Sequence, residues 1–149
     1  SQYFYLSFGI GDYNRALDYL NRWVSLPQQQ GREDLQAVAR IMELLLHYEM
    51  DNYKLLESLL RSSYRSLKRN NGLFGFEQAF LQFIRKSVNA PSRAEQQVLF
   101  QQLSAQLSEL KEKPSEKVIF QHFDFEAWLD SKIEGITFAR AVQNKQSGA

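Results

Sequence analysis

Two short acidic groups, each with one histidine, contain the residues of this chain that could do chemistry. Glu43, His47 and Asp51 are spaced by four residues, so on a helix they share one face and offer two carboxylates and an imidazole. A metal site needs at least three converging ligands and neighbouring groups that orient them. We predict that His47 is a structural residue, with a metal or acid–base role as the alternative.

The second group is His122, Asp124 and Glu126, which straddles an expected helix break. Capping of the next helix accounts for Asp124 without any chemistry. The sequence has no Gly-rich phosphate loop, no nucleophile elbow and no HExxH spacing. It has no Cys, which removes disulfides, thiolate metal sites and a Cys nucleophile together. We therefore expect no enzymatic activity, no metal and no cofactor.

A basic group is the best case for binding of nucleic acid. Its members are Arg61, Arg65, Lys68 and Arg69. Cations spaced by four residues line one helix face, and Tyr64 among them could stack a base. However, the helix dipole alone favours cations near a helix C-terminus. The formal net charge of +1 also lacks the basic surplus of a dedicated nucleic-acid binder. We favour the structural explanation and keep nucleic-acid binding as the alternative.

The composition is that of one folded domain. The chain has 149 residues, of which 44% are hydrophobic and 13% aromatic, enough to bury a core. No apolar stretch approaches the roughly 20 residues that span a bilayer, so we expect no membrane insertion. The chain opens inside an apparent helix without an initiator Met, which we interpret as an excised domain. The lack of Cys is compatible with a reducing compartment, and we expect a cytoplasmic location.

Apolar residues recur at helical spacing along the chain, and no segment shows the alternation of a strand. Seven to eight helices are expected, beginning near residues 3, 12, 33, 52, 73, 92, 115 and 124. Asp12, Ser92 and Asp124 are expected to cap three of them. We assign residues 1–135 to a single domain. Residues 136–149 are sparse in apolar side chains, and we expect a frayed or disordered tail.

A repeated turn organises the N-terminal half. Gly11-Asp12-Tyr13 is followed by the apolar positions Ala16 and Leu20, and the same pattern returns 40 residues later as Asp51-Asn52-Tyr53 with Leu56 and Leu60. A polar turn, an aromatic residue and an apolar face are typical of the junction of a helical hairpin. Two copies indicate a stack of helix pairs.

This pattern resembles the tetratricopeptide repeat (TPR), a helical hairpin of about 34 residues. In the second copy Leu44 and Leu56 stand where the repeat prefers small residues, which predicts wider packing of the helices. The chain is similar to the divergent C-terminal end of a larger bacterial TPR protein. The resemblance implies an all-α fold of antiparallel hairpins in a right-handed solenoid. It also places an aromatic residue at the position of His47, in favour of a structural role.

In TPR proteins the first helix of each hairpin lines a concave groove. By position, the resemblance gives a partner-binding set made of Tyr5, Phe8, Val38, Ile41, Leu45 and Tyr48. An open apolar groove of this kind would bind an amphipathic helix or an apolar peptide. The competing interpretation, which we favour, is that the chain's own segment from Phe120 to Ile133 lies in the groove, because aromatic runs in small domains mostly enter the core.

The leading hypothesis for function is a non-catalytic protein–protein interaction or scaffolding domain. It would bind a protein or peptide partner through a helical-repeat surface and would have no nucleic-acid partner. The alternative is a helical repeat that contacts nucleic acid through the basic group at the end of the fourth helix. The ends of a solenoid expose apolar surface unless they are capped, so a dimer through the repeat end is a further expectation.

Overall fold

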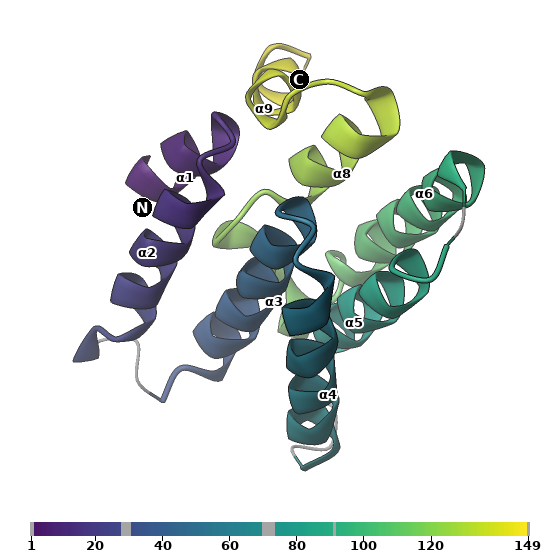
Figure 1. The fold of residues 1–149 in the computed structure, drawn as a ribbon. Helices are drawn as coiled ribbons and strands as arrows, with labels where there is room; N and C mark the ends of the chain where they lie inside the picture. The colour runs from purple at the N-terminus through teal and green to yellow at the C-terminus, as the bar shows by residue number, and fades with distance from the viewer. Residues whose placement is uncertain (1, 28–30, 70–73, 91, 149) are drawn as a thin grey trace.

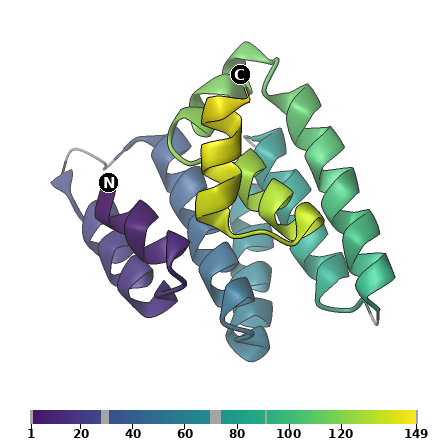
Figure 2. The same ribbon diagram turned by 90° about the horizontal axis from the view of Figure 1, so that it is seen from above.

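The computed structural model describes residues 2–27, 31–69, 74–90 and 92–148 (Figures 1 and 2). Within these ranges the chain is all-helical and contains no strand. The elements in order are α1 (Gln2–Gly9), α2 (Tyr13–Val24), α3 (Glu33–Glu49), α4 (Tyr53–Arg69), α5 (Gly75–Ser87), α6 (Arg93–Leu110), α7 (Pro114–Lys117), the 3-10 helix η2 (Val118–Gln121), α8 (Phe125–Glu134) and α9 (Phe138–Ser147). Among the described residues, no helix is sufficiently long and apolar to cross a membrane.

Most of the expected helices are present, and three predicted caps are confirmed. The Asp12 side chain accepts from the backbone N–H of Arg15 at 3.2 Å, Ser92 caps α6 in the same way, and Asp124 caps α8. A side-chain oxygen at this position satisfies one of the backbone donors that a helix start leaves unpaired. The expected connection at residues 28–30, the helix stop at 70–72 and the helix start at 73 lie outside the described residues.

The first copy of the repeated turn closes α1 with a regular set of backbone hydrogen bonds. The N–H of Ile10 donates to the carbonyl of Leu6 at 3.1 Å, and the N–H of Asp12 donates to that of Ser7 at 2.9 Å. Between them, Gly11 adopts a left-handed φ of 80°. This is a common way to end a helix, because it satisfies carbonyls of the last turn that have no partner within the helix.

The second copy closes α3 with the same set, 40 residues later. Met50 N–H donates to Leu46 at 3.0 Å and Asn52 N–H donates to His47 at 3.0 Å. The left-handed position is occupied here by Asp51, with a φ of 55°. The two turns seen in the sequence are therefore equivalent in backbone geometry as well as in residue pattern.

The left-handed turn predicts that Gly→Ala changes the stability of the protein in opposite directions at residues 9 and 11. Gly11→Ala is expected to cost about 1 kcal/mol of unfolding free energy, since a side chain disfavours positive φ although nothing lies within 4 Å of the added Cβ. Gly9→Ala is expected to stabilise by about 0.5 kcal/mol, because Gly9 is helical and its added Cβ would lie 3.9 Å from Ala139. Urea unfolding measures both, and changes of the same sign would contradict the assignment.

The helices pack in the order of the chain, and the C-terminal part then turns back. Contacts join α1 to α2, α2 to α3, α3 to α4, α4 to α5, and α5 to α6. After α7, η2 packs on α3, α8 on α6, and α9 on both α8 and α1. Figure 2 shows α8 and α9 across the middle of the row that α1 to α6 form. The last quarter of the chain thus covers the earlier helices instead of extending the row.

Residues 138–147, where the sequence predicts a frayed or disordered tail, form α9 in the structure. Phe138 and Ala141 are 8% and 2% exposed, and they lie three residues apart on one face of the helix. The Phe138 ring stacks on that of Phe123 with the centroids 5.5 Å apart. Thr137 caps the helix by accepting from the N–H of Arg140 at 3.1 Å. Two buried side chains and a cap are sufficient here because α1 and α8 already provide an apolar surface.

Candidate functional site

The six residues expected to line an open groove do not form one in this structure. Val38, Ile41 and Leu45 are each 0% exposed. Phe8 is also buried, and Tyr5 and Tyr48 are half-buried. Four of the six, namely Val38, Ile41, Leu45 and Phe8, are part of the domain's own hydrophobic core, and Tyr5 and Tyr48 pack against it. Because these side chains are buried or half-buried, the six residues do not offer a binding surface to a partner.

The covering begins with Phe123, just before α8. Its ring lies 5.8 Å from that of Phe4, 5.3 Å from that of Tyr5 and 5.3 Å from that of Phe8, measured between centroids. The backbone N–H of Asp124 donates to the Tyr5 hydroxyl at 2.9 Å. Aromatic pairs at such distances stabilise beyond the area that they bury. Phe123 and Asp124 therefore cover the inner face of α1.

Trp128 of α8 continues the covering over α3, α5 and α6. Its indole is 1% exposed, and its ring centroid lies 6.1 Å from those of Tyr48, Phe83 and Phe100. Phe125, one turn earlier, packs on aromatic rings of α5. The segment from residue 120 to residue 133 thus occupies the inner face, as the favoured interpretation of the sequence proposed.

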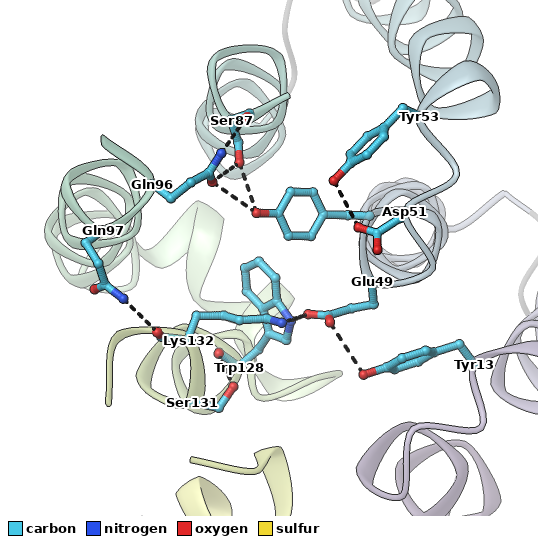
Figure 3. Close-up of polar contacts among 11 residues, drawn as sticks. Tyr13, Glu49, Asp51, Tyr53, Ser87, Gln96, Gln97, Trp128, Ser131 and Lys132 are labelled. Carbon is cyan, nitrogen blue, oxygen red and sulfur yellow. Dashed lines mark hydrogen bonds and ion pairs between the residues drawn. The ribbon is translucent and has the colours of Figure 1, made fainter. Parts of the chain in front are cut away.

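A polar network at the end of α3 holds α8 in this position (Figure 3). The carboxylate of Glu49, 9% exposed, accepts from the indole N–H of Trp128 at 2.8 Å. It also forms an ion pair with Lys132, and the Tyr13 hydroxyl lies 3.5 Å away. Burial and the negative charge of Glu49 raise the pKa of Tyr13 to about 12. Tyr13 is therefore neutral at physiological pH and acts as a donor, not as a base.

A second part of the network joins α3, α5 and α6. The Tyr48 hydroxyl lies 3.0 Å from Ser87 Oγ and donates to Gln96 Oε1 at 3.2 Å. Gln96 Nε2 in turn donates to the backbone carbonyl of Ser87 at 2.5 Å, and Gln97 Nε2 donates to that of Lys132 at 3.1 Å. Burial raises the pKa of Tyr48, which keeps its phenol protonated. A network of groups that are paired with one another in this way rigidifies a core and fixes the positions of the helices that it joins.

In the structure, Glu43, His47 and Asp51 do not form a metal or acid–base site. His47 is buried, and this burial lowers its pKa and favours the neutral imidazole. Asn52 Nδ2 lies 3.5 Å from His47 Nδ1, while Asp51 accepts from the Tyr53 hydroxyl at 2.9 Å. In the part of the chain that the structure describes, no group of three or more His, Cys, Asp or Glu residues could hold a metal ion.

The second histidine makes a contact that spacing along the sequence could not predict. His122 Nε2 lies 3.3 Å from Asp34 Oδ2, across 88 residues of chain. Arg32 forms a two-bond contact with the same carboxylate, at 2.8 and 3.1 Å. The Arg32 guanidinium, with a smaller contribution from His122, lowers the pKa of Asp34. The trio joins the start of α3 to the end of η2.

The basic group of α4 is exposed, as expected for a surface helix. Arg61, Arg65, Lys68 and Arg69 all face solvent, and none forms an ion pair with another described residue. Three of them line a shallow depression together with Ser62. Tyr64 is not available to stack a base, because it is half-buried and the Arg85 guanidinium lies 5.5 Å from its ring centroid.

An exposed apolar strip on α1 is a feature that the sequence analysis missed. Tyr3, Leu6 and Ile10 are 65%, 65% and 78% exposed, and their spacing of three and four residues places them on one face. We call these three residues the α1 outer face. It lies at the end of the row of helices, where the Tyr3 ring stacks on that of Tyr19 of α2.

These features define an all-helical domain whose helices pack on their neighbours in sequence and whose inner face is filled by its own C-terminal part. No family model matches the chain, and neither a curated protein nor a solved structure is significantly similar to it. The resemblance to TPR proteins therefore rests on the sequence pattern described above.

Proposed function

We propose that this chain is a non-catalytic protein-interaction or scaffolding domain of the TPR-like, right-handed type, and that it binds an amphipathic partner helix on the α1 outer face. The observation that carries the proposal is the exposure of three large apolar side chains on one helix face. Contiguous exposed apolar surface in a folded domain marks a site of interaction.

The internal repeat indicates what covers such a face. A shift of 40 residues, the spacing of the two turns, carries Leu6 onto Leu46, which is fully buried in α3. Met42 lies one turn before Leu46 on the same face and lines a pocket with Leu20 and Trp23 of α2. This face of α3 is thus covered by α2, with which α3 is in contact. By the repeat, Leu6 lies where α3 receives α2, and Tyr3 and Ile10 of the α1 outer face correspond to the half-buried Glu43 and Met50.

The apolar residues that α2 buries indicate which side chains the expected partner helix would carry. Its covering face buries the small Ala16 and the larger Leu20, four residues apart and 0% and 3% exposed. The segment Gln2–Gly9 contains no charged residue, so it offers nothing to pair with a charge on the partner. The partner is therefore a helix with small and large apolar residues on one face. Anchors at this spacing are the usual way in which an amphipathic helix is recognised.

The test uses the chain's own α2 as a probe. A peptide of residues 12–26, stapled in helical form because short isolated helices are marginal in water, is titrated into isotope-labelled protein. We expect saturable NMR shifts at Leu6 and Ile10 that are lost in Leu6→Asp/Ile10→Asp. The variant Val98→Asp, at another exposed apolar position, is the control and keeps them.

Two outcomes would reject this occupant. One is the absence of shifts on the α1 outer face in the unsubstituted protein. The other is a concentration-dependent dimer in sedimentation equilibrium that Leu6→Asp abolishes, which would make a second copy of the chain the occupant. The dimer expected from the sequence is thus one outcome of the same experiment.

A second candidate function, contact with nucleic acid, is supported by the four cations of α4, which form no ion pair within the described part of the chain. Reversing Arg61, Arg65 and Arg69 to Glu is expected to weaken binding of a fluorescent single-stranded RNA at least tenfold and to flatten its salt dependence. Reversal of Arg93, an exposed cation on α6, serves as the control. Loss of the helical peptide's binding in the same triple variant would instead move the partner site to α4.

A further inference from the structure

A small pocket lies between the first hairpin, the middle of α3 and the end of η2. Its volume is about 270 Å³. The aromatic side chains of Tyr5, Tyr19 and Trp23 line it, together with the apolar side chains of Leu20 and Met42. An engineered apolar cavity of about 150 Å³ accommodates benzene, so this pocket has room for one aromatic ring with a polar substituent. It is separate from the basic group, and its lining residue Tyr19 lies next to Tyr3 of the α1 outer face.

The walls of the pocket are held by contacts on their other sides. The Tyr5 ring stacks on Phe123 at 5.3 Å between centroids, and the Tyr5 hydroxyl accepts from Asp124 N–H. Tyr19 stacks on Tyr3 at 5.7 Å between centroids. Side chains that are already ordered lose little conformational entropy when a ligand arrives, which favours binding.

Several hydrogen-bond donors on the lining are unused. The Tyr5 hydroxyl proton, the indole N–H of the half-buried Trp23 and the side-chain amide of the exposed Gln121 form no hydrogen bond with another described residue and are open to solvent. Burial raises the pKa of Tyr5, so its hydroxyl keeps that proton. Donors without a partner on the lining of an apolar pocket suit a ligand that carries an acceptor oxygen.

The charged groups on the lining are paired within the protein, whereas the exposed guanidinium of Arg22 lies outside the lining, 5.7 Å from the Tyr19 ring centroid. His122 is also on the lining, and its Nε2 lies 3.3 Å from Asp34, which Arg32 pairs as well. The carboxylate of Asp34 is thus matched by the guanidinium of Arg32. A charged ligand would find no unpaired opposite charge among these groups and would lose its hydration on entry. The ligand that fits is neutral.

We propose that this pocket binds a neutral aromatic ring bearing a carbonyl or carboxamide oxygen. The ring would pack among Tyr5, Tyr19 and Trp23, and the oxygen would accept from the unused donors. The same chemistry occurs in a free aromatic amide and in a phenylalanine side chain with its backbone carbonyl, and the test separates the two sources.

The experiment titrates 4-fluorobenzamide into isotope-labelled protein. The chain has two Trp residues, so its spectrum contains two indole N–H signals. We expect the Trp23 signal to shift saturably with a dissociation constant in the millimolar range and the Trp128 signal to stay in place. No shift up to the solubility limit, or equal shifts of both signals, would overturn the proposal.

A pair of tyrosine variants locates the binding. Tyr19→Ala is expected to weaken binding at least fivefold, as measured by the fluorine linewidth of the probe, whereas Tyr53→Ala on α4 leaves it unchanged. Equal binding to both variants would also overturn the proposal. Displacement of the probe by N-acetyl-phenylalaninamide would identify a protein side chain as a possible source. Binding of the benzamide alone would identify a free small molecule, and both results support the aromatic site.

Discussion

Replacing Trp128 with alanine is expected to cost about 3–5 kcal/mol of unfolding free energy, the usual range for removal of a buried aromatic side chain. The indole is 1% exposed and lies at the meeting point of α3, α5, α6 and α8. The substitution also removes the donor that Glu49 accepts from. Urea unfolding followed by circular dichroism measures the loss, and hydrogen exchange is expected to show loss of protection first in α8 and α9.

The second tryptophan of the chain provides a matched control. Trp23 is half-buried in α2, and Trp23→Ala is expected to cost less than half as much. If Trp128→Ala does not fold, Trp128→Phe retains most of the ring contacts and is expected to cost about 1–2 kcal/mol. Equal losses for the two alanine variants would mean that α8 is not the element that closes the inner face.

Glu49→Ala is expected to cost about 2–3 kcal/mol, because it leaves the buried indole N–H of Trp128 without an acceptor and Lys132 without its partner. The cost lies below that of a fully buried ion pair, since the Lys132 side chain is 29% exposed and reaches water. Glu49→Gln is expected to cost less, because the amide oxygen still accepts from the indole. The free energy of unfolding at pH 7 is the quantity to measure.

An exposed glutamate gives the control for this series. Glu57 is exposed on α4, and Glu57→Ala is expected to change the unfolding free energy by less than about 0.5 kcal/mol. In a double-mutant cycle, Glu49 and Lys132 are expected to show a favourable coupling of about 1 kcal/mol. A Glu49→Ala variant as stable as Glu57→Ala would contradict a structural role for the network.

Local features were accessible from the sequence. The caps at Asp12, Ser92 and Asp124 and the helices that they start depend on residues three or four positions away. The repeated turn likewise depends on hydrogen bonds that span at most five residues, with Gly11 or Asp51 at the left-handed position. Residue type and spacing suffice for such features, because the interacting groups are neighbours in the chain.

The tertiary structure alone decided which helix faces stay exposed. The sequence placed Tyr5 and Phe8 on an inner face and favoured a filled groove over an open one, but it did not show which side chains would meet there. Trp128 and Glu49 are 79 residues apart, and no periodicity encodes their contact. Residues 138–147, too poor in apolar side chains to predict a packed helix, are ordered by surfaces that α1 and α8 provide. The same arrangement leaves the α1 outer face uncovered, since burial depends on which distant apolar faces meet and not on the pattern of any one helix.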